Sequence, residues 1–335
     1  MNNIKYWSEN GNIECNAEIE NCDNLDDLFR LWKEAQKNIK IIDKNENCLK
    51  NTGNFTRDGY IDEKEYKKSK KKVLFILKES NILKGKNVES NEIKEDEQAD
   101  FYSYFLKEKI VINGETKEIY KYDSNTNMII PIAYADYKKK YKFFDNIPKQ
   151  KEKMARMAKY ILDKEITSSY KELCNALKQV AFMNINKMGG TNKTNSKELY
   201  LYYKKYKNFI LKEIEILEPQ VIVIMVGNSK IVNDLNFELN EKLEKNIKII
   251  PMLHTATRGR SLNIKNDEED FFNKNIAPSI EMNWNTLNNE NYKEYQENIF
   301  NKNKNGPFIK FNKTTLEYLI KFIKRYEENN LKLKK

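Results

Sequence analysis

Four short apolar runs, separated by stretches with helical periodicity, constrain most strongly what this chain of 335 residues can fold into. Each run is apolar on both faces of the expected strand, which is typical of the buried strands of a parallel sheet. Strands that alternate with amphipathic helices predict an α/β protein of three layers, α/β/α, with a central four-stranded parallel sheet. The strands are expected at 73–77, 180–186, 221–227 and 247–253.

The remaining segments predict how the chain is organised around this sheet. Residues 1–70 hold one plausible helix, capped by Asn24, and are expected to form an N-terminal helical extension. Residues 71–335 are expected to form the main α/β domain. An irregular, aromatic-rich stretch at about 82–149, with a hairpin turn at Asn113-Gly114, predicts an insertion beside the site.

Composition narrows the class of protein. The net charge of +10 suits an anionic partner such as DNA. The first residues, MNNIKYWSEN, lack the apolar core of a signal peptide, and the longest purely apolar run is far shorter than a membrane span. We therefore expect a cytoplasmic protein with no membrane partner. Four cysteines without CxxC spacing, a single histidine and no strand-to-helix glycine motif predict neither a metal nor a cofactor.

Polar residues follow the expected strands at the edge where ligands bind in open parallel sheets. Glu79 is a carboxylate that is costly to bury unless it is paired, for instance with Lys78 or Lys187, or used in chemistry. Asn184 offers both a donor and an acceptor, as a base edge requires, although an asparagine there can also tie down a turn. His254 is the only histidine, so it carries either a structural role or any histidine-dependent step.

Three of these segments, LFILKESN, AFMNINK and IIPMLHTATR, resemble the signature segments of the uracil-DNA glycosylase superfamily, in the same order along the chain. The similarity covers roughly residues 70–262. The first segment resembles the loop that positions the attacking water, with Leu77 and Ser80 where glycine and proline are usual. The third resembles the histidine-containing loop, with Thr255 in place of proline. The resemblance implies a divergent member of this superfamily.

The resemblance also implies a role for each matched residue. Glu79 would orient water, His254 would stabilise the departing base, and Asn184 would bind the base edge. Phe101 or Phe144 is expected to stack on the base. The residues expected at DNA phosphates are Ser80, Lys187, Thr255, Arg258 and Arg260.

The function that follows is hydrolysis of the N-glycosidic bond of uracil or another altered base, flipped out of single- or double-stranded DNA during DNA repair. Two alternatives remain open. The first is a non-catalytic sensor of the same fold that binds a base, a nucleotide or DNA, for example in phage–host conflict. The second is a nucleoside or small-molecule hydrolase, for which the basic charge would be incidental. Fold analogy does not separate these three functions.

Overall fold

The computed structural model describes residues 17–37, 55, 57–81, 109–112, 115–118, 120–123, 128–131, 149–167, 170–190, 196–242, 247–254, 264–280 and 313–332. Contacts divide the chain into two compact units. Unit 1 comprises Met1–Phe101 and Val180–His254, and unit 2 comprises Tyr102–Gln179 and Thr255–Lys335. This division differs from the expected boundary at residue 70, because the chain enters and leaves unit 1 twice.

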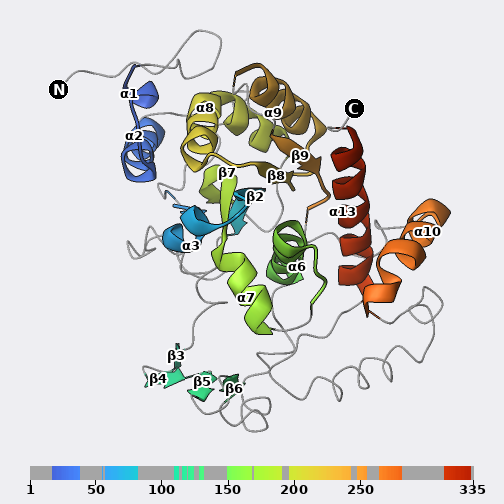
Figure 1. Ribbon diagram of the computed structural model, residues 1–335. Coiled ribbons are helices and arrows are strands. Elements are labelled where there is room, and N and C mark those ends of the chain that lie inside the picture. The colour runs from blue at the N-terminus through green and yellow to red at the C-terminus, as the bar shows by residue number, and fades with distance from the viewer. Residues whose placement is uncertain are drawn as a thin grey trace. The chain divides into compact units, whose positions relative to one another are not determined.

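Unit 1 is built on a five-stranded sheet with the order β1-β7-β2-β8-β9. Figure 1 labels four of these strands, β7, β2, β8 and β9. The strands are β1 (Gly59–Tyr60), β2 (Val73–Asn81), β7 (Val180–Gly190), β8 (Val221–Ile224) and β9 (Lys248–Pro251). The last four strands pair in parallel, which confirms the α/β class and the four expected strands. The fifth strand, β1, was not expected, and it pairs antiparallel with β7 at one edge of the sheet.

Two of the parallel strands are longer than their apolar runs. β2 continues through Lys78 to Asn81, and β7 continues to Gly190. Glu79 therefore lies in a strand, paired with Asn186 of β7, rather than in the loop that follows. Backbone pairing extends these strands past the point where apolar patterning stops, because a ladder needs only backbone donors and acceptors.

Helices connect and cover the strands of unit 1. α8 (Ser196–Leu217) links β7 to β8 and packs on β7, and α9 (Ser229–Lys242) links β8 to β9. Three shorter helices precede β2: α1 (Ala17–Glu20), α2 (Leu25–Lys37) and α3 (Glu63–Lys68). Asn24 caps α2 as expected, since its Oδ1 atom accepts from the backbone N–H of Asp27 at 2.9 Å.

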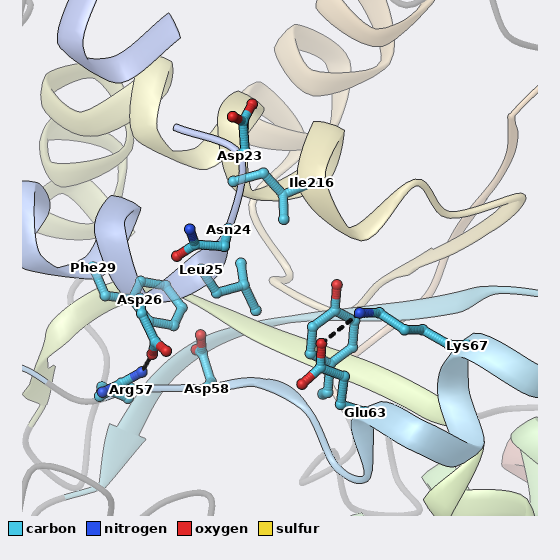
Figure 2. Close-up of a pocket in the computed structure, with 11 residues that line it drawn as sticks. Asp23, Asn24, Leu25, Asp26, Phe29, Arg57, Asp58, Glu63, Lys67 and Ile216 are labelled. Atoms are coloured by element: carbon cyan, nitrogen blue, oxygen red, sulfur yellow. Dashed lines mark hydrogen bonds and ion pairs between the residues drawn. The ribbon is translucent and has the colours of Figure 1, made fainter. Parts of the chain in front are cut away.

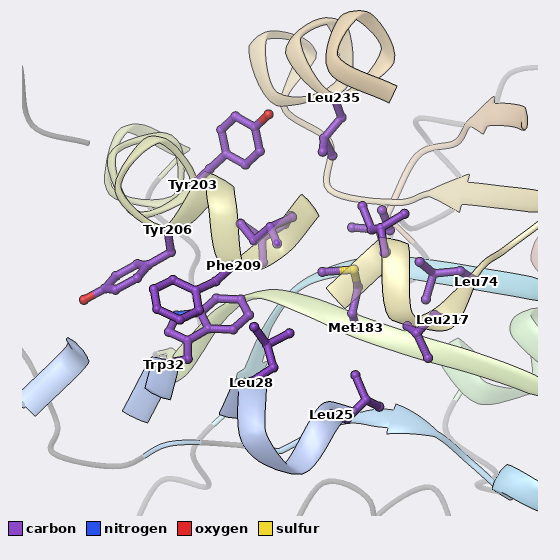
Figure 3. Close-up of a cluster of buried hydrophobic side chains, with 14 of the residues drawn as sticks. Leu25, Leu28, Trp32, Leu74, Met183, Tyr203, Tyr206, Phe209, Leu217 and Leu235 are labelled. Carbon is purple, nitrogen blue, oxygen red and sulfur yellow. The ribbon is translucent and has the colours of Figure 1, made fainter. Parts of the chain in front are cut away.

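One face of the sheet and these helices share a single apolar core (Figure 3). Alternate strand residues contribute to it because successive side chains of a strand point to opposite faces. Trp32 of α2 is fully buried and stacks on Phe209 of α8, with ring centroids 5.3 Å apart. The helix before residue 70 is therefore part of the core of unit 1 and not an appended extension.

Unit 2 contains α6 (Lys149–Asp163), α7 (Tyr170–Lys178), α10 (Asn266–Asn275), the 3-10 helix η3 (Ala277–Ile280) and α13 (Lys313–Lys332). Two strand pairs also belong to it: β3 (Lys109–Ile112) with β4 (Glu115–Glu118), and β5 (Tyr120–Asp123) with β6 (Met128–Pro131). Ile112 of β3 pairs with Glu115 of β4, and the expected turn residues between them, Asn113 and Gly114, lie outside the described residues. Within the unit, Tyr160 of α6 donates to Glu327 of α13 at 2.7 Å.

Candidate functional site

The strand order reverses between β2 and β8. From β2 the chain continues to β7 on one side of it, and later returns to β8 on the other. In open α/β sheets, the crevice outside the carboxyl ends of the strands at such a reversal is the usual place for a ligand. Lys78 and Glu79 lie in the last part of β2, and Gly227 and Asn228 follow β8. Together with His254, we call these residues the carboxyl edge.

Gly227 and Lys78 lie close together at this edge of the sheet. Gly227 has a φ of 61°, in the left-handed region that favours glycine. A Cβ atom placed on Gly227 would lie 3.6 Å from Cε and 3.7 Å from Nζ of Lys78. The half-buried Lys78 side chain thus reaches from β2 to the backbone that follows β8, and its ammonium group lies near Gly227. Sequence reasoning gave Lys78 no role beyond a salt bridge.

Glu79 lies beside Asn186 at the end of the β2–β7 ladder. The half-buried Asn186 is its nearest neighbour in register on the adjacent strand. Adjacent strands are about 4.8 Å apart, so the two backbones run side by side at this edge.

His254 is half-buried three residues after the last residue of β9, Pro251. β8 lies between β9 and β2, so two strand spacings, or roughly 10 Å, separate the lines of Glu79 and His254 across the sheet. Both residues therefore lie at the same edge, on opposite sides of the end of β8. The end of β8 therefore lies between Glu79 and His254.

The side chain of Asn228 is hydrogen-bonded to backbone groups. Its Oδ1 atom accepts from the N–H of Lys230 at 3.1 Å, and its Nδ2 atom donates to the carbonyl of Ser196 at 3.0 Å. The side chain therefore caps α9 and ties it to the start of α8. The carboxyl edge also holds a lysine, an acidic residue and the histidine of the chain: Lys78, Glu79 and His254.

Asn184 lies inside unit 1, with no exposed surface. Its backbone N–H and its Nδ2 atom both donate to Oδ2 of Asp58, at 2.6 and 3.1 Å. Its Oδ1 atom is buried and has no hydrogen-bond partner among the described residues. Asp58 precedes β1 and is 126 residues from Asn184 in sequence, so no local pattern could have predicted this pairing.

Lys187 is not at the surface where a DNA phosphate could reach it. Its side chain is 0% exposed, and its ammonium group pairs with Oδ1 of Asp58 and, at 2.8 Å, with Oε2 of Glu213. We call Asp58, Lys187 and Glu213 the interior cluster. The prediction that Lys187 binds a DNA phosphate is therefore wrong. Its ammonium group is held in the interior by the two carboxyl groups and by the rings of Phe29 and Trp32, whose centroids lie 5.2 and 5.1 Å from Nζ.

Burial also perturbs Glu213, the second carboxyl group of this cluster. Burial raises the pKa of Glu213 well above its ordinary value, the nearby Asp58 raises it further, and Lys187 opposes both. Removing one member of such an enclosed group leaves the others without compensation, so the three side chains depend on one another.

A pocket of about 420 Å³ has Asp58 among its lining residues (Figure 2). It is lined by Asp23, Asn24, Leu25, Asp26 and Phe29 at α2, Arg57, Asp58 and Tyr60 at β1, Glu63 and Lys67 on α3, and Ile216 of α8. Its two basic side chains pair with carboxylates of the same lining: Arg57 with Asp26, and Lys67 with Glu63 at 2.7 Å. We assign no ligand to this pocket, because its described cations are already paired.

Several expected site residues lie outside the described residues: Phe101, Phe144, Thr255, Arg258 and Arg260. Within the described part of the chain, no group of three His, Cys, Asp or Glu residues is arranged to hold a metal ion. The described helices include none that is long and apolar enough to cross a membrane. Comparison with protein-family models, curated proteins and solved structures found no match to this chain.

Proposed function

We propose that this chain is a DNA glycosylase-like hydrolase with the three-layer architecture of the uracil-DNA glycosylase superfamily. It would hydrolyse the N-glycosidic bond of uracil or another altered base in a nucleotide flipped out of cytoplasmic DNA. The observation that carries the proposal is the placement of Glu79 and His254 at the same carboxyl edge, on either side of the strand reversal. This is where an α/β sheet binds its ligand.

The chemistry needs two groups at opposite ends of the scissile bond. Cleavage develops positive charge on the sugar and negative charge on the leaving base. Glu79 would orient the attacking water and offset the cation, and His254 would donate to the departing base. The spacing of roughly 10 Å across the end of β8 supports this division, because it separates the two groups instead of pairing them.

Base binding would fall to Asn184, whose buried Oδ1 atom has no partner among the described residues. A base that bonds to it has to be enclosed, as a flipped-out base is. Stacking by Phe101 or Phe144 belongs to the same proposal. In this proposal Lys78, and not Lys187, is the lysine that contacts a DNA phosphate. The other proposed phosphate contacts are Ser80, Thr255, Arg258 and Arg260. With the net charge of +10, binding to DNA should weaken steeply with salt.

The test uses labelled oligonucleotides that contain uracil, hypoxanthine or a modified cytosine, followed by alkali to reveal abasic sites. We expect strand breaks for at least one base at low salt. His254→Ala and Glu79→Gln should each lower the single-turnover rate about a hundredfold or more. Glu218→Gln is the matched control, since Glu218 pairs with Lys72 at 2.7 Å at the amino ends of the strands and should leave the rate unchanged.

The non-catalytic alternative gives a different pattern. A sensor of the same fold would bind the altered oligonucleotide tightly and leave no abasic site at any enzyme concentration. Leu77 and Ser80, in place of glycine and proline, are the residues that favour it. Absence of strand breaks with retained binding would overturn hydrolysis, and absence of both would overturn the DNA partner as well.

A further inference from the structure

Asp58 holds the side chain of Asn184 in one orientation. Its Oδ2 atom accepts from both nitrogens of Asn184, the backbone N–H and Nδ2. A carboxylate accepts and does not donate, so the edge of the carboxamide that faces Asp58 has to be the nitrogen edge. Turning the carboxamide by half a rotation would set Oδ1 against a carboxylate oxygen in a buried space, which leaves two acceptors facing each other.

Lys187 supports this orientation from the other side of Asp58. Its ammonium group donates to Oδ1 of Asp58, and both side chains are 0% exposed. An ammonium has no acceptor, so this contact matches the carboxylate form of Asp58. A protonated Asp58 could donate as well as accept, and it would then tolerate either orientation of the carboxamide. The ion pair therefore keeps the direction of the hydrogen bonds fixed.

The fixed carboxamide presents one defined polar edge. Asn184 keeps one N–H of its amide and the acceptor Oδ1, which has no partner among the described residues. This pair complements a base edge that carries a carbonyl beside a ring N–H, as uracil does. Cytosine presents an amino group beside a ring acceptor, which sets donor against donor and acceptor against acceptor. The orientation of Asn184 thus decides which edge fits.

We infer that Asp58 is a positioning residue that fixes the carboxamide of Asn184, and so selects bases with a carbonyl beside a ring N–H. This inference rests on the proposed function, in which Asn184 binds the base. Asp58 lies outside the three segments that carry the family resemblance, next to the unexpected edge strand β1. It gives the residues before 70 a part in the site.

The test is the double variant Asp58→Asn/Lys187→Met, which removes both charges together and leaves side chains of similar size. An asparagine at 58 can offer its own nitrogen to Oδ1 of Asn184, so the carboxamide is free to turn. We expect the preference for cleaving uracil over cytosine, in otherwise identical oligonucleotides, to fall about tenfold or more. Circular dichroism establishes that the variant is folded.

Glu213→Gln is the matched control. It also takes a carboxyl group from Lys187, but it leaves both hydrogen bonds between Asp58 and Asn184 in place. Its preference for uracil over cytosine should stay within about twofold of the parent protein, since the carboxamide keeps its orientation. A loss of preference equal to that of the double variant would attribute the effect to the ion pair in general and overturn the role of Asp58.

A second measurement does not depend on catalysis. The side-chain amide protons of Asn184, assigned by NMR with Asn184→Asp, should exchange slowly with solvent in the parent protein, and about tenfold or more faster in the double variant. Fast exchange in the parent overturns the inference. If uracil is cleaved but the preference survives in the double variant, only the inference fails. If no base is cleaved or bound, the proposed function fails, and selection by Asn184 fails with it.

Discussion

The carboxyl edge and the interior cluster both belong to unit 1, but they treat charge in opposite ways. At the edge, Lys78 and His254 are half-buried, and Gly227 between them is exposed. In the interior cluster, the side chains of Asp58, Lys187 and Glu213 have no exposed surface and contact one another. The difference separates two tasks: charges with solvent access can serve a ligand, whereas enclosed charges hold the structure in one arrangement.

The largest effect should come from opening the interior cluster. Lys187→Ala leaves Asp58 enclosed and without its cation, so the free energy of unfolding should fall by about 3–5 kcal/mol. Denaturation in urea measures it. The charge-removing pair Asp58→Asn/Lys187→Met should lose clearly less, because no uncompensated charge remains. Equal losses for the two proteins would show that packing, and not charge pairing, dominates there.

The next effect tests whether the residues before 70 belong to the same interior. Trp32→Ala removes a fully buried ring that stacks on Phe209, and it should lower the free energy of unfolding by about 3–5 kcal/mol. Glu34→Ala, on an exposed position of the same helix, should change it by less than about 0.5 kcal/mol. If the Trp32 variant is as stable as the parent protein, α2 does not contribute to the core of unit 1 and is an appended extension.

The carboxyl edge should respond in activity and not in stability. His254→Ala should change the free energy of unfolding by less than about 1 kcal/mol, since the side chain is only half-buried. Its glycosylase rate should nevertheless fall about a hundredfold, equivalent to about 2.7 kcal/mol of transition-state stabilisation. If the variant loses stability and activity in parallel, His254 has a structural role and not a catalytic one.

The smallest effect sharpens the contrast between two buried lysines. Burial lowers the pKa of Lys205 on α8 to about 7, whereas Lys187 contacts two carboxyl groups. Between pH 7 and 10.5 the unfolded chain holds a proton at Lys205 that the folded chain has released, so stability rises with pH. Lys205→Met should reduce that rise by roughly 1–2 kcal/mol, measured by urea denaturation at each pH. An unchanged rise would mean that Lys205 stays charged.

Much of the sheet could be predicted from local sequence, because each of the four parallel strands contains an apolar run. The run Val221–Ile224 is apolar at every position, and that alone indicates a strand buried on both faces. β1 could not be found in this way. It has two residues, too few for any periodicity, and it exists because β7 offers an open edge to pair with.

The candidate site divides along the same line. Glu79 and His254 were identified because each closely follows an apolar strand, and a parallel sheet brings such ends to one edge. Lys187 also follows an apolar run, so the same reasoning placed it at the sheet edge, whereas its side chain is buried. Whether a lysine points to solvent or to the interior depends on what lies opposite, and here that is a carboxylate 129 residues away.

The sequence by itself determined the α/β class, the four parallel strands and the polar residues at their ends, because these depend on hydrophobic patterning over a few residues. Only the tertiary structure decided which charges are enclosed. Asp58, Asn184, Lys187 and Glu213 meet because a two-residue edge strand, a long parallel strand and a helix converge. A buried charge is tolerated only beside its partner, and that partner is set by the fold.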